Sequence, residues 1–411
     1  MPEFITIIYL IYSFLAFYFL FLFVIIYAKN KDRIFYEPKI TKNYSLSIVV
    51  PCYNEGKSIG GVIESLLDSD YKGLKKIIIV DDCSTDDSYK IIKSYAKKYK
   101  KVIVVRTPKN TGKASGAKNY GAGFVDTELI GFVDADSYPK RDAIGKMIGF
   151  FDDNEVAAVT ASVFVKKMNK FIEGLQSLEY RIIVFTRKLL GFVGAIYVTP
   201  GPLAIYRKKY FDKVGRFDEN NYTEDIELTW NFLSKGYKIE MSVPSKAYTV
   251  VPDNFREWYR QRIRWNIGGL QAINKYKKTF AKSGILGSFV LPFFVLSWVL
   301  GILGIGILVY RGLRRIVINY LATKFSISAQ TAILTFREIN LTPNVLVFFG
   351  TAFLILSLSF TILALFYTKE KEFKKTRILS ILIYSFIYLL VYPFVVINSV
   401  IKYLGKKQKS W

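Results

Sequence analysis

Histidine is missing from all 411 residues, and this absence excludes more chemistry than any other feature of the composition. Serine–histidine hydrolysis, histidine general bases and histidine-ligated metals all require that side chain. Cysteine is scarce as well. Cys52 and Cys83 lie in strand-like contexts without metal-ligand spacing, so we expect two free thiols in a reducing compartment. Acid–base catalysis near neutral pH therefore falls mainly to carboxylates.

Acidic residues are few relative to basic ones. The chain has 33 Asp and Glu against 58 Lys and Arg, which gives a formal net charge of +25. A balance this basic usually indicates contact with nucleic acid, an anionic membrane surface or phosphorylated substrates. Because 51% of the residues are hydrophobic and 22% are charged, we expect apolar segments to be segregated from a charged domain. The lysines are scattered as on a solvated surface, so no nucleic-acid partner is predicted.

Four uncharged runs are each long enough to cross a bilayer: Phe4–Ala28, Gly284–Tyr310, Val345–Tyr367 and Ile378–Ile401. The first is followed by Lys29, Lys31 and Arg33, which indicates an uncleaved anchor whose C-terminal end faces the cytoplasm. We therefore predict an anchor in residues 1–32, a cytoplasmic domain in 33–283 that ends in interfacial helices, and about three transmembrane helices in 284–411.

The charges between the later runs leave two topologies open. Counting spans from a cytoplasmic domain places the basic segment Thr368–Arg377 inside, as the positive-inside rule requires. The same count places Arg311, Arg314, Arg315 and the lysines after residue 405 outside, against the rule. Either four segments cross, or one run is re-entrant or interfacial. The stretch Ile316–Phe336 is expected to lie in the interface.

The first part of the charged domain alternates short β-branched runs with helix-length stretches. This rhythm predicts a parallel sheet with helices on both faces, in which ligands bind beyond the carboxyl ends of the strands. The predicted strands are Leu46–Val50, Lys76–Val80, Val102–Arg106 and Leu129–Val133. The predicted helices are Ile59–Leu67, Asp86–Tyr99 and Ala114–Phe124.

Aromatic or acidic clusters follow three of these strands: Pro51–Glu55, Asp81–Asp86 and Asp134–Asp136. Each cluster alone is also compatible with simple helix capping, a frequent use of Asp and Ser. Three clusters at one edge of one sheet favour a binding site instead. Two aspartates one residue apart can share a divalent cation that bridges a nucleotide diphosphate, and oxygen ligands suit Mg²⁺ or Mn²⁺.

Two further segments have both a functional and a structural interpretation. Thr111–Asn119 opens a helix with small residues and Lys113, which suits close approach to phosphate but also a plain turn and packing face. Gln261, Arg264 and Trp265 fall at i, i+3 and i+4 on one helix face. Taken alone, that face is typical of a basic–aromatic stripe at lipid headgroups.

Taken together and in this order, the segments resemble the inverting family 2 glycosyltransferases of the cellulose synthase, hyaluronan synthase and poly-N-acetylglucosamine synthase group. The resemblance covers about residues 45–276 and the flanking membrane helices. It rests on six ordered motifs: Pro51–Glu55, Asp81–Asp86, Asp134–Asp136, Thr199–Tyr206, Thr223–Asp225 and Gln261–Trp265.

For the donor, the resemblance implies an α/β GT-A-type (Rossmann-like) catalytic domain, a UDP-sugar, and Mg²⁺ or Mn²⁺. Tyr53 and Asp82 are expected to hold the uracil, with Glu55 supporting the nucleotide. Asp134 and Asp136 are expected to face the donor and hold the metal. The other donor-site residues of the matching motifs are Pro51 and Asp81, Lys113 at the diphosphate, and Arg264 near the departing phosphates.

For the acceptor, the resemblance makes Asp225 the general base that takes the proton from the acceptor hydroxyl. An inverting in-line displacement needs such a base opposite the leaving group, and without histidine a carboxylate is the natural choice. Trp265 is expected to stack on the acceptor sugar. The acceptor site is completed by Gln261, Glu224 and the Gly201–Pro202 turn.

The sequence departs from the family in two places. Val250 and Val251 precede Pro252 where the family often has a Glu, and the membrane region is small for a polymer channel. Two reactions therefore stay open. The first adds a hexose or N-acetylhexosamine to a growing β-linked polysaccharide, and the Gln-x-x-Arg-Trp motif favours it. The second is a single transfer to a lipid acceptor.

Overall fold

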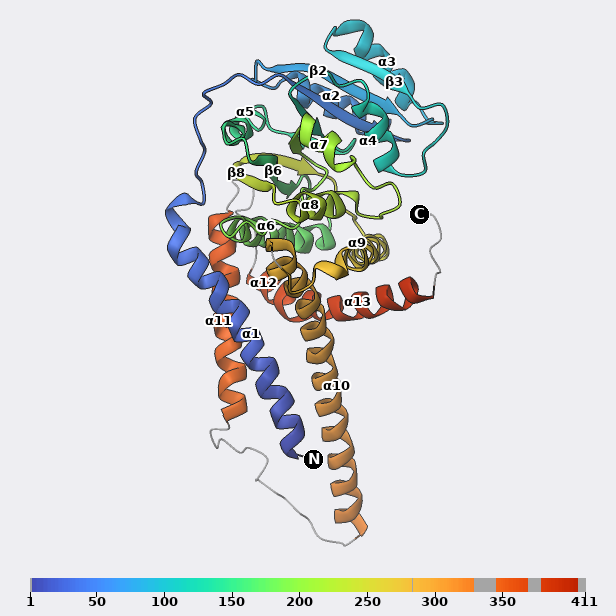
Figure 1. The fold of residues 1–411 in the computed structure, drawn as a ribbon. Helices are drawn as coiled ribbons and strands as arrows, with labels where there is room; N and C mark the ends of the chain where they lie inside the picture. Colours follow the sequence, from blue (N-terminus) through green and yellow to red (C-terminus); the bar gives the residue numbers. More distant parts are fainter. Residues whose placement is uncertain (1, 283, 329–344, 369–377, 406–411) are drawn as a thin grey trace.

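The computed structural model describes residues 2–282, 284–328, 345–368 and 378–405. Within these residues a mixed α/β domain is joined to long apolar helices that extend away from it (Figure 1). The predicted fold class, a GT-A-type domain with a helical membrane region, is confirmed.

The centre of the domain is one eight-stranded sheet of order β3-β2-β1-β4-β7-β6-β8-β5. The strands are β1 Leu46–Cys52, β2 Leu74–Asp81, β3 Val102–Arg106, β4 Leu129–Phe132, β5 Ser137–Pro139, β6 Val156–Val165, β7 Ala204–Arg207 and β8 Lys238–Thr249. The helices of the domain are α2 Ile59–Leu67, α3 Ser88–Lys98, α4 Ala114–Ala122, α5 Gly145–Ile148, α6 Phe171–Gly191, α7 Lys208–Val214, α8 Glu224–Ser234 and α9 Phe255–Tyr276.

The expected parallel sheet is correct for β3-β2-β1-β4 and wrong for the sheet as a whole. β7 runs antiparallel to both β4 and β6, with Phe132 opposite Ala204. After α6, the 195–203 segment brings the chain back to the sheet at the edge where β4 ends. The start of β7 therefore meets the carboxyl end of β4, so the Gly201–Pro202 turn reaches the same edge as Asp134.

Smaller differences concern the ends of elements. β1 continues through Pro51 and Cys52, which pair with Val80 and Asp81, because parallel bonding to β2 extends past the β-branched run. β4 ends at Phe132, one residue before the predicted end. The helix Ile59–Leu67 and the strand Val102–Arg106 have the predicted bounds.

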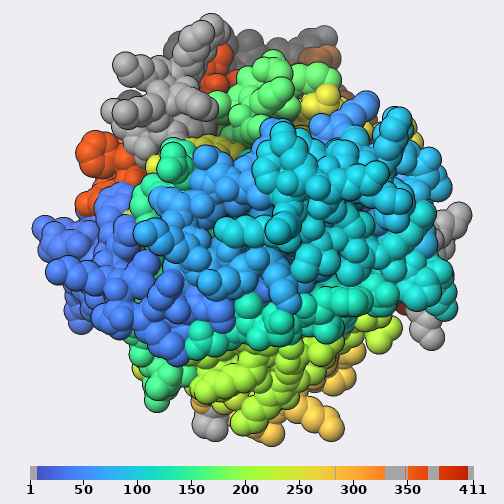
Figure 2. Space-filling view, turned by 90° about the horizontal axis from the view of Figure 1, so that it is seen from above, coloured from blue at the N-terminus to red at the C-terminus, as the bar shows by residue number. Residues whose placement is uncertain are grey.

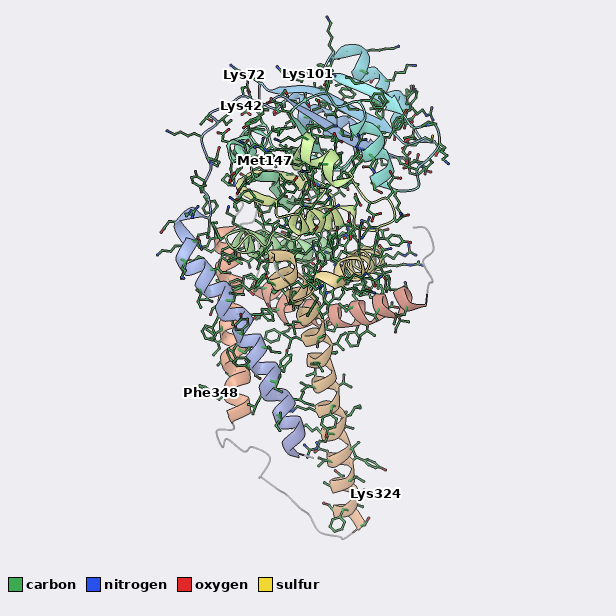
Figure 3. All side chains as sticks on the ribbon, viewed as in Figure 1. Lys42, Lys72, Lys101, Met147, Lys324 and Phe348 are labelled. Carbon is green, nitrogen blue, oxygen red and sulfur yellow. The ribbon has the colours of Figure 1, made fainter. Side chains whose placement is uncertain are left out.

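The elements from β1 to α4 form the face farthest from the membrane helices. Figure 2 views that face, which is covered largely by the blue and cyan first third of the chain. Lysines project from it, including Lys42, Lys72 and Lys101 (Figure 3). Lys42 contacts Glu128 at 2.6 Å on the exposed surface. These side chains lie on a solvated exterior.

Four helical segments are long and apolar enough to cross a membrane. They comprise α1 Pro2–Asn30, α10 Leu291–Ser328, α11 Val345–Tyr367, and α12 Ile378–Ile383 with α13 Leu389–Leu404; π-helical turns at Leu286–Val290 and Tyr384–Tyr388 precede α10 and α13. In Figure 1, α1, α10 and α11 point away from the domain, whereas α13 runs across beneath α9.

The prediction that Ile316–Phe336 lies in the interface stays a prediction as far as Ser328, and the remainder lies outside the described residues. Residues 316–328 continue the α10 helix, since no proline or glycine follows Gly312 in this stretch to end it. From Leu286 to Ser328 the helical segment has 43 residues, a length of about 65 Å at the α-helical rise. It is about twice the hydrocarbon thickness.

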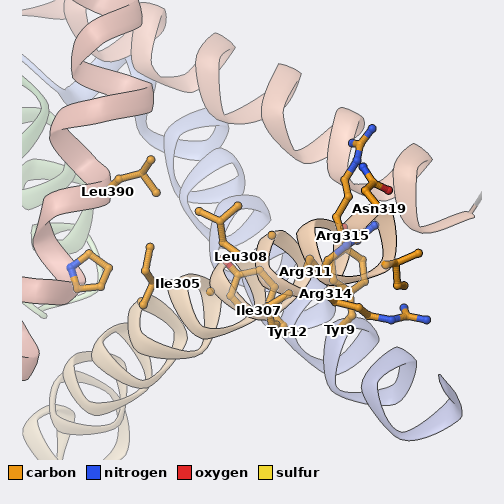
Figure 4. A pocket seen from close by; sticks show the side chains of 15 residues that line it. Tyr9, Tyr12, Ile305, Ile307, Leu308, Arg311, Arg314, Arg315, Asn319 and Leu390 are labelled. Atoms are coloured by element: carbon orange, nitrogen blue, oxygen red, sulfur yellow. The ribbon is translucent and has the colours of Figure 1, made fainter. Parts of the chain in front are cut away.

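A cavity of about 890 Å³ lies among α1, α10 and α13, remote from the acidic motifs (Figure 4). Its polar lining comes from one end of α10 and the first turns of α1: Arg311, Arg314, Arg315, Asn319, Tyr9 and Tyr12. Gly304 allows the approach of Tyr12, because a Cβ at that position would lie 3.0 Å from the Tyr12 hydroxyl.

The catalytic domain packs directly on the membrane helices through α6. The Phe185 ring lies 6.0 Å from Tyr27 of α1 and 5.6 Å from Phe360 of α11, between ring centroids. Arg181 of the same helix donates to the carbonyl oxygen of Leu365. Phe185, Arg181 and Leu365 are all buried by these contacts. α6 therefore fixes the position of the domain relative to the membrane helices.

Candidate active site

Lys118 joins two of the acidic motifs. Its ammonium nitrogen lies 3.1 Å from Oδ1 of Asp134 and 2.9 Å from Oε1 of Glu224, and its side chain is only 4% exposed. Asp134 follows β4, and Glu224 opens α8 beside Asp225. Asp134 and Glu224 therefore contact one buried cation, which also interacts electrostatically with Asp225.

Gly201 supports Asp134 through close contact. A Cβ on Gly201 would lie 2.1 Å from Oδ2 of Asp134, so only glycine fits here. The backbone amide of Asp134 also donates to the carbonyl oxygen of Gly201 at 3.2 Å. The turn predicted to lie beside the acceptor thus contacts the acid predicted to face the donor.

Asp136 is surrounded by other acids. Burial and the neighbouring charges of Asp134 and Glu55 raise the pKa of Asp136 to about 6, although the Ser137 hydroxyl donates to it at 3.0 Å. Glu55 itself accepts a 2.6 Å hydrogen bond from Ser58. A cation placed among these carboxylates would relieve both the burial and the repulsion.

The residues present fit a divalent cation of the expected kind. Among the described residues, no group of three or more acidic or cysteine side chains could hold a metal with protein ligands alone. The predicted site does not use protein ligands alone. Asp134 and Asp136 would supply carboxylate oxygens, and oxygens of the donor's diphosphate would complete the coordination shell of the cation. The raised pKa of Asp136 supports this assignment.

Asp225 and Glu224 are adjacent but respond oppositely to their surroundings. Burial and the charge of Glu224 raise the pKa of Asp225 to about 6. Burial also opposes ionisation of Glu224, but Lys118 outweighs it and lowers the pKa of Glu224, with Arg264 contributing. One acid therefore stays ionised as the partner of Lys118, while the other is poised for proton transfer near neutral pH.

On the nucleotide side, Asp82 orders the loop after β3. Its carboxylate accepts hydrogen bonds from the hydroxyls of Thr107 and Thr111, both at 2.7 Å. Asp81 is fully buried and pairs with Arg106 at 3.0 Å. Tyr53 is 50% exposed at the rim. The predicted uracil contacts of Tyr53 and Asp82 stay predictions.

The backbone is unusual at this rim. Asn54 and Cys83 have φ angles of 56° and 62°, a region that residues other than glycine rarely adopt. The Asn54 side chain accepts a 2.8 Å hydrogen bond from the Thr85 amide, which ties the two strand ends together. Backbone in such conformations is often found where a ligand binds.

Lys113 lies against the loop before α8. Its ammonium donates to the carbonyl oxygen of Glu219 at 2.8 Å and lies 4.8 Å from the Tyr222 ring centroid. The structure thus brings Lys113 to the segment that leads into Glu224. Its predicted contact with the diphosphate stays a prediction.

The predicted acceptor residues share α9 with a buried arginine that the sequence analysis overlooked. Arg262 is 1% exposed, pairs with Glu179 of α6 at 2.5 Å and lies 4.0 Å from the Trp265 ring centroid. Its Nη1 also donates to the Gln261 side chain at 2.5 Å. Arg262 therefore orients both Gln261 and Trp265.

α9 is in tight contact with the start of α8 at Gly268. A Cβ there would lie 2.1 Å from Oγ1 of Thr223, which directly precedes Glu224. Arg264, one turn earlier on α9, is exposed and acts electrostatically on Glu224. The Gln-x-x-Arg-Trp segment is thereby held at the same site as the acids.

Sequence reasoning missed Lys118, Arg262 and two residues of α6, Tyr180 and Arg187. Lys118 was visible only as part of the small-residue segment Thr111–Asn119. Since lysine is usually a surface residue, nothing in the sequence distinguished a buried lysine from the many exposed ones.

Comparisons with known proteins agree with this geometry. Residues 47–215 match the family model described as "Glycosyl transferase family 2". The chain is 27% identical over 296 residues to the poly-beta-1,6-N-acetyl-D-glucosamine synthase of Staphylococcus epidermidis, which covers 69% of this chain and 71% of that protein. The identity to the Staphylococcus aureus protein of the same name is 27% over 258 residues, covering 62% and 61%.

Among solved structures, the chain is similar to a mannosyltransferase from Pyrobaculum calidifontis determined in complex with GDP-Man and Mn²⁺. The TM-score is 0.62 at 18% sequence identity, and the alignment covers 97% of this chain and 99% of the other. At that identity the likeness shows a common fold, including the membrane helices.

Proposed function

Because the chain belongs to glycosyltransferase family 2, we propose that it transfers a hexose or N-acetylhexosamine from a UDP-sugar, with inversion, to a growing β-linked polysaccharide at a membrane. The observation that carries this proposal is the bridge of Lys118 between Asp134 and Glu224, with Asp225 alongside. This bridge supports the proposal because Asp134, which would face the donor, and Asp225, which would act as the base, both interact with the same buried lysine.

In the reaction, the Asp225 carboxylate accepts the proton of the acceptor hydroxyl. The acceptor oxygen bonds to the anomeric carbon from the face opposite the nucleotide, the bond from that carbon to the diphosphate oxygen breaks, and UDP leaves. Arg264 supplies positive charge toward the departing phosphates. Mg²⁺ or Mn²⁺, held by Asp134 and Asp136, would stabilise the negative charge of the diphosphate as a Lewis acid.

The sugar and the extent of transfer follow from different observations. The name of the staphylococcal relatives favours N-acetylglucosamine and repeated transfer. The alternative is a single transfer to a membrane lipid, which the small membrane region favours because only α1, α10 and α11 of the described helices extend side by side from the domain.

We also propose a topology with the catalytic domain in the cytoplasm, because Lys29 lies in the last turn of α1 and Lys31 and Arg33 follow it. If α13 is interfacial, as its crosswise course suggests, the chain leaves Leu404 on the catalytic side, which satisfies the positive-inside rule for the tail. The proposed units are an anchor in 1–32, the catalytic domain in 33–283 and the membrane region in 284–411.

A panel of radiolabelled UDP-sugars tests the function. Purified protein with Mg²⁺ or Mn²⁺ should release UDP from one of them, and gel analysis should show a ladder of products. One discrete glycolipid would favour the alternative. If no nucleotide sugar is turned over with polysaccharide or lipid acceptors, the proposal is refuted.

A further inference from the structure

Arg187 of α6 is a buried cation with unused hydrogen-bond donors. The residue is 4% exposed, yet its Nε and Nη1 atoms have no hydrogen-bond partner. Removing a guanidinium from water without replacing its hydrogen bonds costs several kcal/mol, about 1–3 for each unpaired group and more for a charged one. A ligand that accepts these hydrogen bonds would remove that penalty.

The arginine is linked to the helix that carries the proposed catalytic base. It interacts electrostatically with Asp225 and Tyr180 and is hydrogen-bonded to the Tyr197 side chain. The carbonyl oxygen of Tyr197 in turn accepts a 3.2 Å hydrogen bond from Trp230 of α8, the helix that carries Asp225. The unpaired donors therefore belong to a cation whose field acts on Asp225 and whose tyrosine partner packs on α8.

The same face of α6 continues beneath the rest of the site. Tyr180 is seven residues before Arg187, two helical turns along one face. It interacts electrostatically with Asp136 on the donor side and with Arg262 on the acceptor helix. This face of α6, with Tyr180 and Arg187, thus lies between the donor acids and α9, and we call it the floor of the site.

The floor is also the part of the site nearest the membrane. Phe185, two residues before Arg187, packs against Tyr27 of α1 and Phe360 of α11. Arg181, one turn further back, is bonded to the carbonyl oxygen of Leu365. α6 thus lies where the domain meets the membrane helices, so a ligand that approaches Arg187 from the side of α1 and α11 comes from the level of these helices.

We propose that Arg187 binds a phosphate group of a lipid-linked acceptor and so places the acceptor hydroxyl beside Asp225. This inference rests on the proposed function and applies to the first transfer, in which the accepting hydroxyl still lies close to the phosphate. A guanidinium matches phosphate oxygens in charge and geometry, whereas sugar hydroxyls could satisfy its hydrogen bonds without neutralising its charge.

A matched pair of acceptors tests this. One is a sugar linked to a short polyprenyl chain through phosphate, and the other is the same sugar as a neutral alkyl glycoside. Wild-type protein should show a KM about 10- to 100-fold lower for the phosphate-linked acceptor, as expected for charge-assisted hydrogen bonds. Arg187→Gln should remove this preference, so that the ratio of the KM values for the alkyl glycoside and the phosphate-linked acceptor falls to about one.

Arg181→Gln is the control, since it also removes a buried cation from α6 but one that is bonded to α11. It should keep the phosphate preference. Arg187→Lys retains the charge and should recover part of the preference, which also provides a readout if Arg187→Gln does not fold. Equal wild-type KM values for the two acceptors would overturn the inference, as would an Arg187-dependent preference for a uronate-terminated oligosaccharide.

The test separates this inference from the function beneath it. A wild-type protein that turns over nucleotide sugars without preferring the phosphate-linked acceptor loses only the role of Arg187. A protein that turns over none of them with either acceptor loses the proposed function itself.

Discussion

Gly268 of α9 lies directly against Thr223, the residue before the two acids of α8, and a Cβ at Gly268 would sit 2.1 Å from the threonine Oγ1. The helix that carries Gln261 and Trp265 is thus seated on the helix that carries the proposed base through a contact that only glycine allows. The spacing between α9 and the start of α8 is therefore set by the backbone of Gly268 packed on the Thr223 side chain.

Gly268→Ala should therefore move α9 away from Asp225. Overpacking of this kind lowers the free energy of unfolding by about 1–3 kcal/mol, and we expect at least a tenfold loss of kcat in steady-state assays. Gly174→Ala in α6 is the control, because a Cβ there meets no atom within 4 Å. Unchanged turnover in Gly268→Ala would show that the contact is not needed for the geometry of the site.

Gly201→Ala should weaken the donor side in the same way. The added methyl group would collide with the Asp134 carboxylate, so Asp134 must turn away from the position in which Lys118 holds it. We expect a higher apparent requirement for metal and UDP-sugar, measured as KM values for both. If both KM values stay at the wild-type level, Asp134 has no part in donor binding.

Lys118→Met should destabilise the protein because Glu224 would keep its buried position without its counter-ion. Removing one partner of a buried pair lowers the free energy of unfolding by about 3–5 kcal/mol. Lys76→Met breaks the exposed pair with Asp126 and should change it by less than about 1 kcal/mol. Denaturant titration of both variants measures the difference, and equal small changes would contradict the bridging role.

The pH dependence of catalysis should follow Asp225. Its pKa is raised to about 6, and a base acts only when deprotonated, so kcat/KM should be level above pH 7 and fall about tenfold per unit below pH 6. Because the pKa of Asp136 is also about 6, the profile should be measured at saturating Mg²⁺ or Mn²⁺, which keeps that carboxylate ionised. A flat profile down to pH 5 would contradict the assignment of Asp225.

The parts of the fold that followed from the sequence are those with a local physical cause. The runs of β-branched residues predicted β1 to β4, and charge-free length predicted the membrane segments. The antiparallel β7 depends on how the chain returns after α6, which no local pattern in residues 134–203 records. By contrast, the helix through Ser328 has a local cause, since no proline or glycine follows Gly312 up to that residue.

Motif order predicted the acids of the site better than their partners. Asp134, Glu224 and Asp225 were recognisable because acids at strand ends and helix starts are placed by the sheet. Lys118, Glu179 and Arg262 are charged residues whose burial is set by neighbours far away in sequence, since Glu179 and Arg262, for example, are 83 positions apart. Their roles follow only from three-dimensional contacts.

The most direct test of the account is turnover by Asp225→Asn. The variant should bind UDP as tightly as wild type, because Asp225 does not contact the donor in this scheme, and should lose about 10²- to 10⁴-fold in the rate of sugar transfer. Transfer at the wild-type rate, with UDP binding intact, would contradict the claim that Asp225 deprotonates the acceptor.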